Sequence, residues 1–287
     1  MSFVMFARAH GLEVGDLVPS DRIRRCVTHE HPRKKNGAYL WDGTRGWVFD
    51  WAGEAKTHWY EDPNAKPWTD AEKRAWAMRR QTELQSRERA YENTALRADV
   101  MLRSATPGPH NYFALKGFPD ERGLIGEDGA LLIPMRSLDG KLRGLQVIRW
   151  VESDRRYEKK MLHGMRAKGG VFRLGHQTAQ ETFLVEGYAT GLSVRAALHS
   201  VGLRGSVLVC FSAGNLVYVA PQVRGRCFVF ADNDESKAGE EAAIKTGLPY
   251  CMSDVEGEDA NDLHNRAGLM AVAAKLMAVR RQERAVA

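Results

Sequence analysis

The chain has 287 residues and a net charge of +6, from 42 Lys and Arg against 36 Asp and Glu. Its hydrophobic fraction of 44% and charged fraction of 27% are those of a globular protein, which excludes wholesale disorder. The four cysteines, Cys26, Cys210, Cys227 and Cys251, form no CxxC pair, so a disulfide framework is excluded. Without a long apolar run or the pattern of a secretion signal, we expect a cytoplasmic protein that does not enter membranes.

Residues 1–66 indicate an N-terminal module rich in β-strands. In NGAYLWDGTRGWVFDWAGE, the Asp42-Gly43 and Arg45-Gly46 dipeptides separate short aromatic and β-branched runs, which is typical of hairpins. From Asp21 to Lys35, six basic residues stand against two acids. The aromatic residues beside this basic tract either form the core of the module or stack single-stranded bases.

Residues 67–106 predict a helical connector. The segment from Thr69 to Ser104 contains no Gly or Pro, is rich in helix-forming residues and offers Thr69 as an N-cap. Its eight basic and six acidic residues nearly balance, so we expect one or two solvated helices rather than a dedicated DNA-binding helix.

Residues 107–176 indicate a small mixed α+β subdomain with a basic tract. The runs GALLIPMR and GKLRGLQVIRW flank an Asp139-Gly140 turn and predict an antiparallel pair of strands. From Arg155 to Arg173, seven basic residues accompany one acid, Glu158. Such a tract can follow a phosphate backbone, although a single exposed lysine usually has no specific role.

Residues 177–287 predict an α/β domain built on a parallel sheet. Short apolar runs such as TFLVEG, VLVCF and CFVFADND alternate with helical patterns, and a last helix starts near Asn261. Strands with continuous apolar runs are buried on both faces, so we expect helices on both sides of the sheet.

Acidic residues follow several of these strands. Because the carboxyl ends of parallel strands meet at one edge of a sheet, we expect these carboxylates to share a site. Crowded carboxylates repel one another unless a cation lies among them, and oxygen ligands suit Mg²⁺. The pattern predicts a site for Mg²⁺ or Mn²⁺, although a single strand-end acid is more often solvated or an N-cap. The expected metal ligands are Glu186, Asp232, Asp234, Asp259 and Asp262.

The order and spacing of these motifs resemble the TOPRIM domain, which bacterial-type primases, topoisomerases and some nucleases share. EGYATGLSV, FSAGNL, FVFADND with Gly239 downstream, and GEDANDL are similar to the TOPRIM region of phage and plasmid DNA primases. The resemblance implies a TOPRIM Rossmann-like parallel sheet flanked by helices, with Glu186, Asp232 and Asp234 as catalytic residues. For a phage-encoded chain it implies the host cytoplasm.

The resemblance extends upstream. LLIPMRSLDGKLRGLQVIR, YEKKMLHG and AKGGVFRLG match the small subdomain that precedes TOPRIM in these primases. The match implies that basic residues of these segments line a cleft facing the acids and contact template or nucleotide phosphates. The residues expected to bind nucleotide or nucleic acid are Arg143, Lys159, Lys160, Lys168, Arg173, Gly187 and Asn215.

The resemblance weakens at the N-terminus. Primases of this kind usually carry a zinc ribbon with CxxC pairs, whereas here Cys26, His29 and His31 form the only local cluster, with His58 distant. We therefore expect a module without zinc at the position of a zinc ribbon. The candidate template contacts are Arg24, Arg25, Lys34, Lys35 and Trp41.

These features predict a DNA primase that makes short RNA primers on single-stranded DNA from ribonucleoside triphosphates, working with a separate replicative helicase. Glu186 is either a metal ligand or the group that receives a proton during synthesis. Two alternatives stay open. One is a TOPRIM nuclease that uses the same acids to activate water, and the other is a non-catalytic protein that binds nucleic acid or a helicase.

Overall fold

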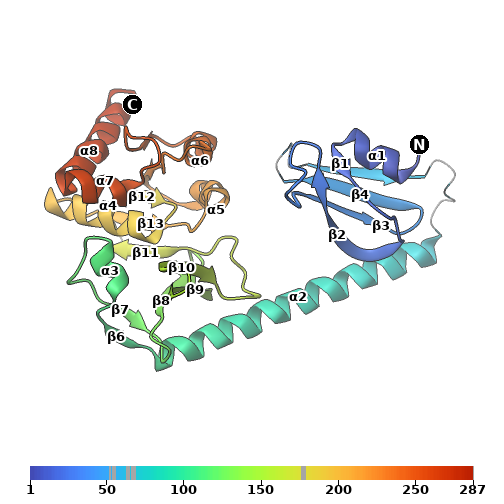
Figure 1. Ribbon diagram of the computed structural model, residues 1–287, viewed down its shortest axis with the longest axis horizontal. Coiled ribbons are helices and arrows are strands. Elements are labelled where there is room, and N and C mark those ends of the chain that lie inside the picture. Colours follow the sequence, from blue (N-terminus) through green and yellow to red (C-terminus); the bar gives the residue numbers. More distant parts are fainter. Residues whose placement is uncertain (52, 54–55, 63–64, 66–68, 176–178, 287) are drawn as a thin grey trace. The chain divides into compact units, whose positions relative to one another are not determined.

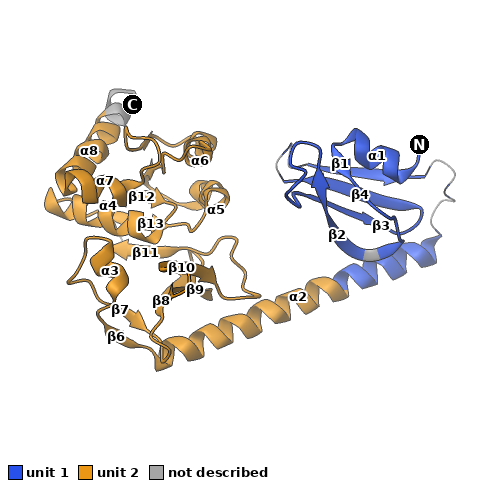
Figure 2. Cartoon of the chain, in the orientation of Figure 1, with its two compact units in different colours: residues 1–81 blue, residues 82–287 orange. Residues whose placement is uncertain are grey.

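The computed structural model describes residues 1–51, 53, 56–62, 65, 69–175 and 179–286, apart from the side chains of residues 21 and 282–286. The chain forms two compact units, Met1–Gln81 and Thr82–Ala287 (Figure 2). The boundary between them falls inside the segment expected to be a helical connector. Among the described residues, no helix is both long and apolar enough to span a membrane.

The first unit is an antiparallel sheet packed against a short helix (Figure 1). Phe3 of the helix contacts the rings of Tyr39 and Tyr60, and all three side chains are buried. Burial of these rings stabilises this small core. The elements, in the sheet order β1-β2-β3-β4-β5, are α1 (Phe3–Ala9), β1 (Leu12–Glu13), β2 (Ser20–Thr28), β3 (Gly37–Trp41), β4 (Arg45–Asp50) and β5 (Thr57–Glu61).

One exposed helix, α2 (Asp70–Ser104), follows the first sheet, as the polar connector predicts. Thr69 and Glu72 form a reciprocal capping box at its start. The Thr69 hydroxyl accepts a hydrogen bond from the Glu72 backbone N–H at 3.3 Å, and the Glu72 carboxylate accepts one from the Thr69 N–H at 2.8 Å. Near the other end, buried Ala98 packs against the first sheet of the second unit.

The second unit begins with an antiparallel sheet in the order β10-β9-β8-β7-β6. One face of this sheet, with Leu131 and Ile133, packs on the main core of the unit, and the other, with Leu132 and Leu145, packs on α2. The elements are β6 (Thr106–Gly108), α3 (Asn111–Leu115), β7 (Gly123–Ile125), β8 (Leu131–Arg136), β9 (Leu142–Val151) and β10 (Arg156–Met161).

A third sheet, in the order β11-β13-β12-β14-β15, completes the second unit. Strands β12 to β15 are parallel, as predicted for residues 177–287, whereas β11, which comes from the preceding range, is antiparallel to β13. The chain enters β11 directly from the antiparallel subdomain, where Val171 bridges to Arg136 at the end of β8. An edge strand reached in this way needs no crossover helix.

Helices cover both faces of this third sheet, so the predicted α/β class is confirmed (Figure 1). Phe183 and Phe228 face the core formed with α4, α7 and α8, whereas Leu184 and Val229 face α5 and α6. The elements are β11 (Phe172–Gly175), β12 (Glu181–Val185), α4 (Tyr188–Ser200), β13 (Ser206–Val209), α5 (Ala213–Val219), η1 (Ala220–Gln222), β14 (Arg226–Phe230), α6 (Ala238–Thr246), β15 (Tyr250–Cys251), α7 (Ala260–Ala267) and α8 (Leu269–Val286).

Candidate active site

The carboxyl ends of β12 and β14 bring the first predicted acids together. Val185 pairs directly with Phe230 in the parallel register, so Glu186 and Asp232 leave the sheet at the same edge. This is the edge at which α/β sheets open into ligand-binding crevices. The register accounts for the proximity of two acids that lie far apart in the sequence.

Asp232 carries an unsatisfied oxygen. Its Oδ1 is buried and has no hydrogen-bond partner within the described part of the chain. Burial raises the pKa of Asp232 to about 8, and the nearby charges of Asp259, Glu186 and Asp234 add to this increase, while Lys159 opposes it. A buried carboxyl without a partner is costly, because its ionised form loses hydration without compensation. The arrangement favours a bound cation or a retained proton.

Glu186 and Asp234 differ in their surroundings. Burial raises the pKa of Glu186, and the charge of Asp234 contributes. Asp234 instead lies just before α6, whose N-cap residue is Lys237, and its carboxylate accepts hydrogen bonds from the Ser236 hydroxyl and from the backbone N–H groups of Ala238 and Gly239. These bonds lower its pKa, the Ser236 hydroxyl most. Asp234 is therefore held ionised, whereas Glu186 takes up a proton more readily.

Asp259 and Asp262 form the N-terminal capping box of α7. Asp259 Oδ1 accepts hydrogen bonds from the N–H groups of Asn261 and Asp262 at 2.6 and 2.9 Å. Asp259 Oδ2 accepts one from the Thr190 hydroxyl at 2.9 Å, which ties α7 to α4. Asp262 in turn accepts from the Asp259 N–H at 3.3 Å. Both acids already hold the fold together, as strand-end N-caps often do.

Lys159 of β10 faces these acids. The protein packed around its ammonium group lowers the pKa of Lys159, although the residue is exposed overall, and Lys116 adds to the effect. The charges of Asp259, Asp232 and Asp262 oppose that decrease, so the ammonium lies within electrostatic reach of all three. Lys116 follows the short helix α3 and was not among the predicted residues, because an isolated lysine after FAL carries no signal in the sequence.

Lys160 and Lys168 have other partners. Lys160 follows Lys159 on the strand, so the two side chains point to opposite faces, and Lys160 pairs with Glu158 at 2.8 Å. Lys168 lies over the ring of Tyr218, with its Nζ 4.3 Å from the ring centroid. Neither lysine has a described contact with the acids.

Asn215, which was predicted to bind nucleotide, forms hydrogen bonds to the backbone of the protein. Its amide donates hydrogen bonds to the carbonyls of Gly170 and Cys210 at 2.8 and 2.7 Å, and its Oδ1 accepts one from the Gly169 N–H at 2.7 Å. These bonds fasten the loop that carries Lys168 to the start of α5.

The remaining predicted residues of the second unit are distributed around the sheets. Arg173 donates to the hydroxyl of Ser206, which starts β13, so it lies at the amino-terminal end of the parallel strands rather than beside the acids. Gly187 is the N-cap of α4. Arg143 of β9 keeps a buried Nε without a partner within the described residues.

In the first unit, the structure separates Trp41 from Trp47, Trp51 and Trp59. The Trp41 ring stacks on Phe3, with centroids 6.0 Å apart, and packs partly buried against the core, so its template contact stays a prediction. Strand alternation explains the difference, because Tyr39 and Trp41 share the face covered by α1. Arg24, Lys34 and Lys35 are exposed, and the Arg25 guanidinium lies 3.8 Å from the centroid of the Trp51 ring.

The opposite face of this sheet is open and aromatic. Trp47 pairs across the strands with Trp59, which is 68% exposed. Phe49 contacts Trp51, with ring centroids 4.8 Å apart. Together with Arg25, these rings form a surface that we call the aromatic face: Arg25, Trp47, Phe49, Trp51 and Trp59. Aromatic rings beside cations are the usual components of surfaces that stack single-stranded bases.

The residues discussed for zinc have other environments. Cys26 is buried, and burial raises the pKa of its thiol to about 11, although Arg25 opposes the increase. His29 pairs with Glu13 at 2.9 Å, and His58 stacks on His10 at 3.9 Å between ring centroids. Over the described ranges, no three His, Cys, Asp or Glu side chains are close enough together to hold a metal ion by themselves.

Comparison with known proteins finds similarity in three-dimensional structure. No family model matches this sequence, and no curated protein matches it. Among solved structures, the chain is similar to one described as the E. coli primase catalytic core, with 16% sequence identity and a TM-score of 0.36. The match covers 70% of this chain and 73% of that one.

Proposed function

We propose that this chain is a DNA primase of the TOPRIM type, which joins ribonucleotides into short primers on single-stranded DNA. The observation that carries the proposal is the buried, unpartnered oxygen of Asp232, which lies near Glu186 and Asp234 at one sheet edge and within electrostatic reach of Lys159. The motifs EGYATGLSV and FVFADND, which resemble those of phage and plasmid primases, supply these acids.

The donor set fits Mg²⁺ or Mn²⁺. The free oxygen of Asp232 and the ionised carboxylate of Asp234 are hard oxygen ligands. Glu186 would be a third ligand only if its side chain moved toward them, because no three such side chains of the described residues are close enough together to hold a metal ion. Mg²⁺ is commonly bound by one or two carboxylates together with substrate phosphates and water, so a complete protein cage is not required. Asp259 and Asp262 support the site mainly through α7, because their oxygens are engaged in its cap. When bound, the metal ion would neutralise the triphosphate and orient it.

Side chains of the protein would bind the phosphates and accept the proton that the reaction releases. Lys159, with Lys116 near it, would hold phosphate oxygens in front of the acids. Synthesis forms a bond between a primer 3′-oxygen and the α-phosphorus and breaks the bond to pyrophosphate. Glu186 has a raised pKa, so it is suited to receive the proton that the 3′-hydroxyl loses.

Template would be held in part by the first unit. Its aromatic face combines stacking surfaces with the Arg25 guanidinium, and Arg24, Lys34 and Lys35 add exposed positive charge. This combination suits single-stranded DNA without base specificity. A separate helicase partner stays a prediction.

A primer-synthesis assay tests the proposal. Intact protein, mixed single-stranded DNA, labelled ribonucleoside triphosphates and Mn²⁺ should give short labelled RNA. Asp232→Asn, which keeps the size of the side chain, should abolish the products. Asp254→Asn is the matched control, because Asp254 is 84% exposed, pairs with Lys275 and is not among the proposed metal ligands.

A second reaction, with labelled DNA and no nucleotides, distinguishes a primase from a nuclease. Cleavage that requires Asp232 would assign a TOPRIM nuclease instead of a primase. DNA binding with neither synthesis nor cleavage would assign a non-catalytic nucleic-acid-binding protein.

A further inference from the structure

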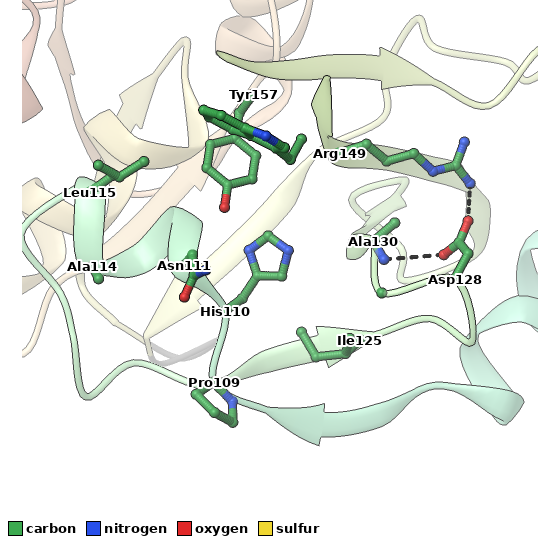
Figure 3. Close-up of a pocket in the computed structure, with 12 residues that line it drawn as sticks. Pro109, His110, Asn111, Ala114, Leu115, Ile125, Asp128, Ala130, Arg149 and Tyr157 are labelled. Carbon is green, nitrogen blue, oxygen red and sulfur yellow. Dashed lines mark hydrogen bonds and ion pairs between the residues drawn. The ribbon is translucent and has the colours of Figure 1, made fainter. Parts of the chain in front are cut away.

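The antiparallel subdomain has a concave surface that none of the predicted acids lines. A hollow of about 960 Å³, open to solvent, is formed by the segment that enters α3, by β7, by the turn before β8 and by the β9–β10 hairpin. Figure 3 shows the rings of Tyr157 and His110 on one side of this hollow and the Arg149–Asp128 ion pair on the other. None of the residues used for catalysis above lines it.

Aromatic rings form one wall of the hollow. Tyr157 contacts Trp150, its cross-strand partner, with ring centroids 5.2 Å apart, and contacts His110 at 5.5 Å. Trp150 is 45% exposed, although it lines a concave surface. A flat ligand that covered this ring would remove a large apolar area from water at little cost in side-chain entropy.

The polar groups around the wall are fixed. The Nδ1 atom of His110 accepts a hydrogen bond from the Tyr112 N–H at 3.2 Å, and burial lowers the pKa of His110, so the ring is neutral at pH 7. Asp128 accepts a hydrogen bond from the Ala130 N–H at 3.1 Å and pairs with Arg149. The pair presents donors and acceptors at the rim without a net charge.

The balanced charges of Arg149 and Asp128 indicate whether the hollow suits a phosphate or a nucleobase. Of the described residues that line the hollow, Arg149 is the only cation, and Asp128 neutralises it. An isolated phosphate would therefore gain little here. A nucleobase, with a flat π-face and hydrogen-bonding edges, matches both the rings and the rim.

We propose that this hollow binds an unstacked nucleobase through Trp150 and Tyr157. The base comes either from a single strand that passes the subdomain or from a free nucleotide. The site does not depend on the catalytic proposal, because it uses none of the same side chains.

Photo-crosslinking tests this site. A 12-nucleotide oligothymidylate with one 5-iododeoxyuridine should crosslink to Trp150, Tyr157 or His110 in the intact chain, as mapped by mass spectrometry. Competition with unlabelled ligands shows whether the bound base belongs to a strand or to a free nucleotide. If excess unlabelled oligonucleotide removes the crosslink and UMP does not, the base belongs to a strand, whereas removal by UMP assigns a free nucleotide. Crosslinks confined to other residues would overturn the proposal.

Variants measure the contribution of the ring. Trp150→Ala should weaken oligonucleotide binding about fivefold or more, since one stacked base is worth about 1 kcal/mol or more. Trp150→Phe should restore most of that loss. Trp76→Ala, which removes another exposed tryptophan that does not line the hollow, should bind like the wild type. Equal binding by Trp150→Ala and wild type would reject the site.

Asp232→Asn separates this proposal from the primase assignment. This variant should still crosslink in the hollow. A wild-type chain that makes no primer and yet crosslinks at Trp150 would support the base site and contradict the primase assignment.

Discussion

At the scale of single residues, the burial of Asp232 lowers the stability of the fold when its carboxyl is ionised. Its Oδ1 is buried without a partner among the described residues, and burial raises its pKa to about 8. Buried carboxyl groups with strongly shifted pKa values are typical of functional sites, where a residue needed for the reaction lowers the stability of the fold. The stability of the metal-free chain should therefore depend on this carboxyl.

The sign of that dependence follows from the two pKa values. The folded state holds the Asp232 proton up to a pH of about 8, whereas the unfolded chain releases it near the ordinary 3.8. As pH rises between these values, the free energy of unfolding therefore decreases. Asp232→Asn stays neutral, so its gain in melting temperature in EDTA should be greater at pH 8 than at pH 5, by about 2 °C or more. Equal gains at both pH values would show that Asp232 ionises normally.

Two tryptophans of the first unit should give opposite phenotypes. Trp41→Ala removes a ring that packs on Phe3, so it should lower the free energy of unfolding by about 3 kcal/mol. Trp59→Ala removes an exposed ring, so stability should change by no more than about 0.5 kcal/mol. Single-stranded DNA binding, followed by fluorescence anisotropy, should weaken in Trp59→Ala. Normal DNA binding by Trp59→Ala would show that the aromatic face does not bind the template.

The sequence predicted the positions of the acids in the fold more directly than those of the aromatic and basic residues. Acids after apolar runs have a fixed place, because a strand end is visible in the pattern. Trp41 and Trp47 both lie in strands with aromatic residues on each face, so alternation alone did not show which face α1 covers. Arg173 was grouped with the basic tract, but its neighbours follow from the antiparallel course of β11, which the sequence did not reveal.

At the scale of elements, α6 depends on a close approach to the strand that carries Asp232. A Cβ atom on Gly239 would lie 2.2 Å from the Asp232 carbonyl oxygen, so helix and strand end would have to separate. Gly239→Ala should therefore lower stability by about 1–3 kcal/mol and reduce primer synthesis together.

Gly214 of α5 is the matched control for this substitution. A Cβ atom there would meet nothing within 4 Å, so Gly214→Ala should leave stability unchanged or raise it by up to about 1 kcal/mol. Denaturant unfolding of both variants makes the comparison. Equal effects would mean that the close approach at Gly239 does not position Asp232.

At the scale of the whole molecule, the candidate catalytic groups belong to the second unit alone. The boundary of the units was not visible in the sequence, because α2 is uniform in composition across Gln81 and Thr82. A fragment of residues 82–287 should keep Mn²⁺ and nucleotide binding, since the contacts that support the acids lie within it. It should bind single-stranded DNA more weakly, because it lacks the aromatic face. Loss of Mn²⁺ binding by a folded fragment would contradict this division of roles.

The central claim is that the acids at the end of β12 and β14 bind a divalent cation together with a nucleoside triphosphate. Calorimetric titration of Mn²⁺ into the intact chain, with a non-hydrolysable ribonucleoside triphosphate present, tests it most directly. We predict saturable binding by the wild type and by Asp254→Asn, and a loss of at least about tenfold in affinity for Asp232→Asn. Unchanged Mn²⁺ affinity in Asp232→Asn would contradict the proposed site.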